Sequence, residues 1–195
     1  MHVWHYAETW NAHWTRAMEN MLDSPHLPFV HRRTIGGALA RRMKPDSKME
    51  MEVHSTPTGF RSSWTLDGVA SDAYLDWLRP NGMSLRIPIP NRLMNLFMWC
   101  VPVDENHTRM MLVSTRDFLK LQPLAALLDH FNKRILREDQ AVVESSYPVE
   151  SPPVSEERSV ATDRATLAFR RWYLERKKRG PSEVTPLPEA PTLAS

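Results

Sequence analysis

The stretch between residues 48 and 118 constrains the fold most strongly, because strand-like runs alternate there with hairpin signals. KMEMEVHS (48–55) places Met49, Met51 and Val53 on one face and polar side chains on the other, as a half-buried strand does. Asp67-Gly68 and Asn81-Gly82 are hairpin-type dipeptides. The pattern predicts an antiparallel sheet, whose further strands are residues 2–7, TGFRSSWTL (58–66), MSLRIPI (83–89), LMNLFMWCVPV (93–103) and HTRMMLVSTRDF (107–118).

Three helices are expected around these strands. The first, residues 9–22, begins at Thr9 and has four apolar side chains on one face: Trp10, Trp14, Ala17 and Met21. A long helix over residues 123–145 begins at a proline, and a last helix over residues 163–179 ends at a glycine. The order of helix, antiparallel strands and helices predicts an α+β domain, in which one curved sheet grips a long C-terminal helix.

The chain is long enough for one domain, which we expect over residues 1–180. The segment 181–195 is rich in proline and lacks aromatic residues, which is typical of a disordered tail. The formal net charge of +2 is too small for a nucleic-acid-binding surface, and no apolar run is long enough to span a membrane. Polar residues interrupt the N-terminus where a signal peptide would need an apolar run. We therefore expect a cytoplasmic protein that binds neither nucleic acid nor membrane.

Cys100 is the only cysteine of this sequence, and this limits the metal chemistry. One cysteine forms no internal disulfide and excludes a structural zinc site built on cysteines. It also excludes a complete Rieske cluster within this sequence, since such a cluster needs two cysteines and two histidines.

His26 and His31 are the candidate imidazole ligands. On an uninterrupted helix, residues five apart point in directions about 140° apart and cannot share one ion. Pro25 and Pro28 remove backbone donors and bias the preceding residues away from the helix, so the chain must leave the helix and turn near Pro28. The turn allows both imidazoles to point at one position. Taken alone, two histidines at this spacing are more often core or surface residues than a pair of metal ligands.

The long helix supplies the third candidate, Asp139. Its spacing predicts one buried face, made of Leu124, Leu128, Phe131, Ile135, Asp139 and Val142. A buried carboxylate needs a cation, hydrogen bonds or a metal, whereas Glu138 is expected to point elsewhere and to be solvated. Asp139 therefore completes a set of two imidazoles and one carboxylate, which suits non-haem iron(II). The same ligands suit zinc, and an arginine or backbone donors are alternative partners for Asp139.

The motif ENMLDSPHLPFVH resembles the iron-binding motif of Rieske non-haem iron oxygenase alpha subunits, and REDQAVVE (137–144) resembles the motif that carries the iron carboxylate. PVDENHTRMMLVSTRDF (102–118) is similar to the strand region of the demethylase-type and pheophorbide-oxygenase-like branches, and the resemblance covers roughly residues 3–175. It implies a helix-grip domain of the START/Bet v 1 type, with mononuclear iron(II) at His26, His31 and Asp139.

The resemblance also implies roles for two residues of the first motif. In the family, an acidic residue three positions before the first histidine links the iron to the Rieske centre of a neighbouring subunit, and Asp23 occupies that position. Asn20 lies at the spacing seen in the demethylase-type branch, where it would help to shape the subunit junction. The alternatives are that Asp23 satisfies local backbone donors and that Asn20 ends the helix.

The sequence departs from the family in having neither the C-x-H nor the C-x-x-H motif of a Rieske domain. We therefore expect the [2Fe-2S] centre only in trans, on a Rieske domain or a ferredoxin and reductase chain, and expect this chain to be inactive without it. Three explanations remain open: a fragment, a split gene, or lost catalysis. The family's homotrimer is a further expectation, although it normally depends on contacts between Rieske and catalytic domains.

The function implied is an oxidoreductase, a mono- or dioxygenase that uses iron(II) and O2 to hydroxylate or oxidatively demethylate an aromatic or cyclic substrate. Asn95, the only polar side chain on its strand face, is a candidate substrate contact, and Trp64, Phe97 and Phe131 are candidate pocket walls. The alternative for Asn95 is a satisfied position in the core, and the three large aromatic residues belong to the core by default. A non-enzymatic carrier of hydrophobic ligands and a zinc hydrolase are the competing hypotheses.

Overall fold

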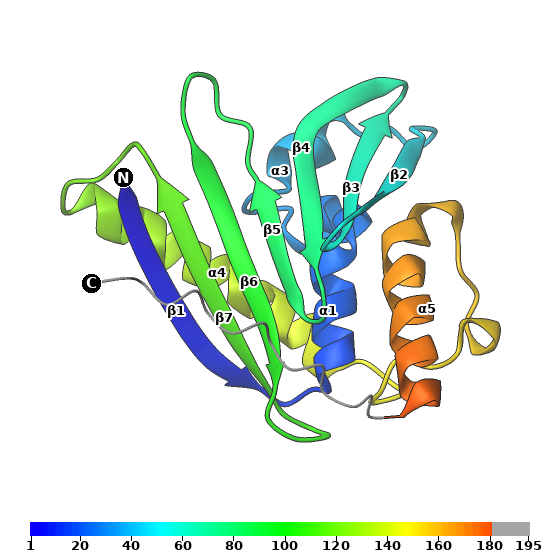
Figure 1. Ribbon diagram of the computed structural model, residues 1–195. Helices are drawn as coiled ribbons and strands as arrows, with labels where there is room; N and C mark the ends of the chain where they lie inside the picture. The colour runs from blue at the N-terminus through cyan, green and yellow to red at the C-terminus, as the bar shows by residue number, and fades with distance from the viewer. Residues whose placement is uncertain (181–195) are drawn as a thin grey trace, which may run out of the picture.

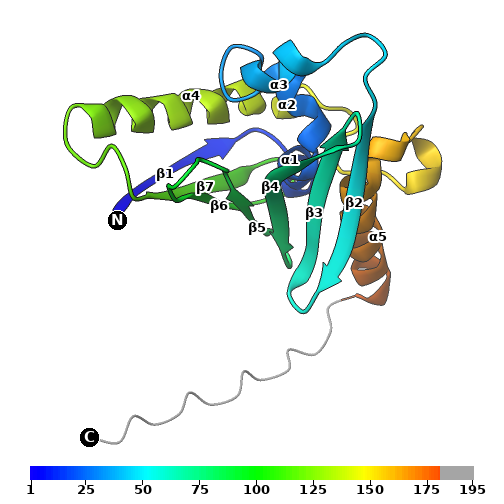
Figure 2. The ribbon, with the colours of Figure 1, turned by 90° about the horizontal axis from the view of Figure 1, so that it is seen from above.

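A computed structural model describes residues 1–180, which form a curved, seven-stranded sheet with helices on its concave side (Figures 1 and 2). Every neighbouring pair of strands is antiparallel, in the order β1-β7-β6-β5-β4-β3-β2. The predicted α+β, helix-grip architecture is confirmed. The strands are β1 His2–Trp10, β2 Met49–Thr56, β3 Gly59–Leu66, β4 Val69–Leu78, β5 Gly82–Arg86, β6 Met94–Pro102 and β7 Thr108–Arg116.

The sequence patterns did not predict strand β4, although the hairpin signals on either side of it, Asp67-Gly68 and Asn81-Gly82, lie where the chain turns between strands. Asp67 and Gly68 both have positive φ, 52° and 78°, and join β3 to β4 in a two-residue turn. Asp72 and Asp76 lie on the face opposite Leu75 and Trp77, but Ser71 on the buried side and Tyr74 and Leu78 on the other weaken the alternation of β4 in the sequence. Leu75 and Trp77 are its buried side chains, and they turn toward the concave side.

Three helices of two or more turns pack against the sheet: α1 Trp14–Leu22, α4 Leu124–Glu144 and α5 Arg164–Arg179. In Figures 1 and 2, α4 lies across β1, β7 and β6, whereas α5 lies beside β2 at the other end. The expected helix start at Thr9 is wrong, because β1 continues to Trp10, which is fully buried and pairs with Thr108. The cap is His13, whose side chain accepts a hydrogen bond from Thr15 N.

The buried face of α4 differs from the expected one. The buried positions are Ala125, Asp129, Asn132, Leu136, Asp139 and Val143, so the face is rotated by about one residue. Leu124 and Val142, which were expected in the core, are 52% and 42% exposed. Asp139 belongs to both faces, which is why its burial was predicted correctly.

A buried ion pair explains the rotation of α4. Arg116 of β7 is fully buried, and its Nη1 donates to Asp129 Oδ1 at 2.7 Å. Its Nη2 donates to the Ala125 carbonyl at 3.1 Å, and His2 Nε2 lies 3.2 Å from Asp129 Oδ2. A buried guanidinium requires such partners, so α4 turns its polar residues toward the sheet at this end.

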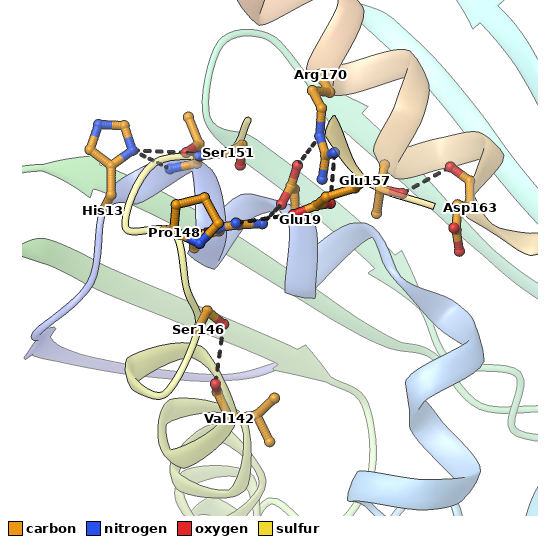
Figure 3. A network of polar contacts seen from close by, with 12 residues as sticks. His13, Glu19, Val142, Ser146, Pro148, Ser151, Glu157, Asp163 and Arg170 are labelled. Carbon is orange, nitrogen blue, oxygen red and sulfur yellow. Dashed lines mark hydrogen bonds and ion pairs between the residues drawn. The ribbon is translucent and has the colours of Figure 1, made fainter. Parts of the chain in front are cut away.

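A second polar network ties α5 to α1, the helix that leads into the candidate ligand segment (Figure 3). Glu19 accepts from Arg16 Nη1 at 3.0 Å and from Arg170 Nε at 2.7 Å. Glu157, in the connection between α4 and α5, accepts from both arginines at 3.3 and 2.8 Å. Ser151 N in the same connection donates to Thr15 Oγ1 at 3.1 Å. These contacts hold the first two turns of α1 in place.

Two further expectations came from composition: that no segment spans a membrane, and that the chain ends in a disordered tail. Among residues 1–180, none of the helices is long and apolar enough to cross a lipid bilayer. The expected disordered tail, 181–195, lies outside the described residues and stays a prediction.

Candidate metal centre

Two short turns after α1 bring His26 and His31 together. The helix ends at Leu22, and Pro25 lies in a 3₁₀ turn, Ser24–His26. A single helical turn, α2 Leu27–Val30, follows and has Pro28 in its first turn. The expected break after α1 is present, but Pro28 begins a new turn rather than ending one. The two imidazole rings lie 5.1 Å apart between centroids, at an interplanar angle of 65°.

Asp139 of α4 completes a cluster of three donor atoms. Its Oδ1 lies 3.4 Å from His26 Nε2 and 3.0 Å from His31 Nε2, and the donor atoms of all three residues lie within 4.8 Å of one another. Bonds of about 2.1 Å to one metal, at octahedral to tetrahedral angles, separate neighbouring ligand atoms by about 3.0–3.4 Å. The donor set and its spacing therefore fit a single divalent metal.

The charge state of Asp139 also suits a ligand. Burial alone would raise the pKa of Asp139, but its hydrogen bonds and charge interactions with His26 and His31 lower it to about 2. Asn20 Nδ2 donates to Asp139 Oδ1 at 2.9 Å, so Asn20 helps to orient the carboxylate. Asp139 is thus an anion at neutral pH, with its orientation set by contacts from α1 and from the histidines of the segment that follows it.

Glu138 does not point into solvent, as the sequence suggested. Its Oε2 lies 2.9 Å from His31 Nδ1 and accepts from Thr34 Oγ1 at 2.7 Å. His31 is 1% exposed and lies between the two acidic residues. Burial lowers its pKa, but hydrogen bonds and charge interactions with Asp139 and Glu138 outweigh burial and raise it. The expectation failed because it used helix geometry alone, whereas the segment containing His31 reaches around the helix to meet Glu138.

The cluster lies at one end of an apolar cavity of about 60 Å³. The apolar walls come from the concave side of the sheet and from α4, and include Leu75, Met83, Leu96, Met98, Leu112 and Leu136. A second cavity of about 380 Å³ shares five of its residues: Ser24, Leu27, Ile35, Leu75 and Leu85. The inner cavity therefore adjoins a space large enough for part of a small molecule.

Asn132 is the polar residue of this cavity that the sequence analysis missed. It is 4% exposed, lines the inner cavity, and its Nδ2 has no hydrogen-bond partner among residues 1–180. A buried amide without a partner is uncommon and points to a ligand or a water. Asn132 precedes Asp139 by seven residues, which is about two helical turns. This spacing from Asp139 was the signal by which the sequence could have identified Asn132 as a residue on the same helix face.

The four expected substrate contacts do not line the inner cavity. Strand alternation puts Asn95 and Phe97 on the face of β6 opposite Leu96 and Met98, which line it. Trp64 lines the second cavity, and Phe131 lines a separate hollow near the start of α4. Residues 93–103 are apolar at both parities, so the sequence did not distinguish the two faces of β6, and a substrate role for Asn95 and Phe97 stays a prediction.

Asp23 lies between the inner cavity and the protein surface. It lines the inner cavity and also a polar hollow of about 240 Å³ that includes Arg16, Glu19, Asn20 and Arg170. Its Oδ2 lies 3.8 Å from His26 Nδ1, beyond hydrogen-bond distance. Burial raises the pKa of the Asp23 carboxyl, and the nearby His26 partly offsets that effect. Asp23 is therefore the carboxylate that separates the candidate metal centre from a polar surface.

Comparisons with known proteins identify relatives over nearly the whole described chain. A methylxanthine N3-demethylase of Pseudomonas putida, NdmB, is 28% identical over 188 residues, covering 85% of this chain and 47% of that protein. A methylxanthine N1-demethylase of the same organism, NdmA, is 25% identical over 182 residues, covering 87% and 48%. The chain spans about half the length of the curated relatives it matches.

Solved structures share the fold. NdmA of Pseudomonas putida CBB5 with caffeine superposes with a TM-score of 0.72 at 23% identity, covering 91% of this chain and 54% of that chain. Dicamba monooxygenase bound to 3,6-dichlorosalicylic acid gives a TM-score of 0.69 at 16% identity, covering 92% of this chain and 61% of that chain.

Residues 10–178 match the family model of the vanillate O-demethylase oxygenase C-terminal domain. The chain therefore belongs to that family, the catalytic domains of Rieske oxygenases.

Proposed function

We propose that this chain is the catalytic domain of an oxygenase that demethylates or hydroxylates a cyclic substrate, using iron(II), O2 and electrons from a Rieske centre outside this sequence. One observation carries the proposal: three donor atoms with metal-ligand spacing meet at the end of an apolar cavity. Two imidazoles and one carboxylate leave coordination positions for O2, and bound iron(II) would supply the oxygen chemistry.

The remaining residues act by positioning and by excluding water. His26, His31 and Asp139 would hold the iron, and Asn20 orients Asp139. The apolar walls exclude water from the reacting centre and bind the flat face of a ring. We assign to Asp23, which reaches the polar surface hollow, the task of connecting the centre to a Rieske domain of another chain. A homotrimer remains the expected assembly.

The relatives suggest the substrate class. Two are methylxanthine demethylases, and solved structures of NdmA contain caffeine and theobromine. We therefore propose an N-methyl or O-methyl group on an aromatic or heterocyclic ring as the reacting group. For an N-methyl group on a ring nitrogen the balance is N–CH3 + O2 + 2e⁻ + 2H⁺ → N–H + CH2O + H2O. The two electrons must come from the external Rieske centre, since this sequence has a single cysteine.

Hydrogen peroxide tests the proposal without the missing domain, because it carries both the oxygen atom and the two electrons: N–CH3 + H2O2 → N–H + CH2O + H2O. The chain loaded with iron(II) and mixed with peroxide and a panel of methylxanthines and methoxybenzoates is expected to release formaldehyde with at least one of them. The zinc-loaded chain and the chelated chain are the controls. Formaldehyde release that is equal in all three samples would rule the proposal out, and ligand binding that survives chelation would favour a carrier.

Asn132 is expected to provide the polar contact to the substrate. In an Asn132→Leu variant, ligands with a ring carbonyl or ring nitrogen should bind about tenfold more weakly, because a hydrogen bond worth roughly 1–1.5 kcal/mol is lost. The free energy of unfolding should stay the same or rise, since the variant removes a buried amide without a partner. Calorimetric titration with caffeine and urea unfolding measure the two effects. An unchanged affinity for every acceptor-bearing ligand would exclude this role.

A further inference from the structure

We propose that Glu138 is a positioning residue that makes His31 the firmly held ligand of the metal and leaves His26 the more adjustable one. The inference rests on the proposed metal function and goes beyond the three ligands. The Glu138 side chain is only 22% exposed, and its Oε2 lies 2.9 Å from His31 Nδ1. Glu138 thus contacts the Nδ1 of His31. The other ring nitrogen, Nε2, faces Asp139 and lies 3.0 Å from its Oδ1.

The contact determines which nitrogen of His31 is free to bind. With Glu138 accepting at Nδ1, the proton of the neutral imidazole resides there and the Nε2 lone pair points at the cluster. Carboxylates that hold a ligating histidine in this way also increase its donor strength. Glu138 therefore selects the tautomer of His31 that suits a metal ligand.

Glu138 is itself held in place. Thr34 Oγ1, three residues beyond His31, donates to the same Oε2 at 2.7 Å. Arg134 Nε, one helical turn earlier on α4, donates to Oε1 at 3.3 Å. Hydrogen bonds from the chain around His31 and from α4 thus orient the carboxylate, and they join the segment that carries His31 to the helix that carries Asp139.

The second imidazole has no such support. His26 Nδ1 is buried and has no hydrogen-bond partner among residues 1–180, and the carboxylate near it, that of Asp23, is 3.8 Å away. The two imidazoles are therefore unequal: a carboxylate holds the Nδ1 of His31, whereas the Nδ1 of His26 has no such partner within residues 1–180. From this asymmetry we infer that loss of Glu138 affects the metal through His31 alone.

The test measures metal binding without turnover. Cobalt(II) is titrated into the chain by its visible absorption, in competition with a chromophoric chelator. Glu138→Ala is expected to weaken cobalt binding by about 10–100-fold, the usual effect of losing such a carboxylate. Glu138→Gln keeps an oxygen that can accept from Nδ1 and should recover much of the affinity. Glu144→Ala, which removes a carboxylate from the last turn of the same helix, is the matched control and should bind cobalt as the unaltered chain does.

Two further measurements distinguish positioning from general damage to the fold. The Nδ1 proton of His31 should give a slowly exchanging NMR resonance in the metal-loaded chain, which Glu138→Ala abolishes and Glu138→Gln retains. Glu138→Ala should also weaken cobalt binding further in a His26→Ala background but not in a His31→Ala background. Equal cobalt affinity of Glu138→Ala and the unaltered chain, or equal effects in both backgrounds, would overturn the inference. Since no substrate is involved, a negative peroxide assay would leave this result standing.

Discussion

The Asp139→Ala variant is expected to lose tight binding of iron(II) and cobalt(II), with a loss of affinity of more than about 100-fold, because it removes a direct ligand rather than a supporting residue. The carboxylate is 5% exposed, and it is the anionic member of the cluster. With its pKa at about 2, it is ionised at neutral pH and offers a full negative charge to the ion. The two imidazoles alone supply neither that charge nor the third donor.

The measurement is an anaerobic titration with each metal, with circular dichroism to check that the chain is folded. Asp139→Asn preserves the shape and the acceptor for Asn20 but removes the charge, so it separates the two contributions and should still bind poorly. Asp46→Ala, at an exposed turn between α3 Gly37–Arg42 and β2, is the control. A folded Asp139→Ala variant that binds cobalt(II) as tightly as the control would show that the metal centre is assigned to the wrong residues.

The second large effect is expected for stability. Asp129→Ala should lower the free energy of unfolding by about 3–5 kcal/mol, the usual result of breaking a buried ion pair by removing one partner. Arg116, fully buried, would keep a carbonyl contact to Ala125 but lose its carboxylate. The Nε of Arg116 already lacks a hydrogen-bond partner within residues 1–180. Loss of the Asp129 carboxylate would therefore leave a second part of this buried guanidinium without a partner.

A double variant distinguishes the cost of an unpaired charge from the value of the pair. Arg116→Met combined with Asp129→Leu removes both charges and replaces them with apolar side chains of similar size, so much of the lost stability should return. Urea unfolding of the single and double variants measures the difference. If Asp129→Ala changes the free energy of unfolding by less than about 1 kcal/mol, the pair contributes no more than an exposed one.

The grouping of His26, His31 and Asp139 could be predicted from the sequence, whereas the surroundings of that group could not. Prolines at positions 25 and 28 signal a break in the chain, and Asp139 stands out among apolar neighbours at helical spacing, so both features are local. The contact between His31 and Glu138 is not local. It depends on how the turn after α2 wraps around α4, which periodicity within one helix does not reveal.

The face of α4 illustrates the same limit. An apolar count favoured the stripe through Leu124 and Val142, which the structure leaves largely exposed. The buried stripe contains Asp129 and Asn132 because Arg116, on a strand that precedes the helix, requires an anion there. Sequence patterns treat polar residues as solvent-facing, so a buried polar pair is not recognised until its partner is known. The two faces of β6 could not be distinguished in the sequence for a different reason, because alternate positions are apolar on both of them.

The strand order has a consequence for synthesis on the ribosome. The first strand, β1, pairs along its whole length with β7, the last strand to be made. During synthesis, β1 therefore cannot form this pairing until about a hundred further residues have been added. The contact of Asn20 with Asp139 spans 119 positions, and that of His31 with Glu138 spans 107. Such distant pairings form late. Because Asp139 lies on α4, the proposed metal centre is complete only in a chain that has been made through that helix. A truncated product that ends before α4 would carry both histidines but lack the carboxylate.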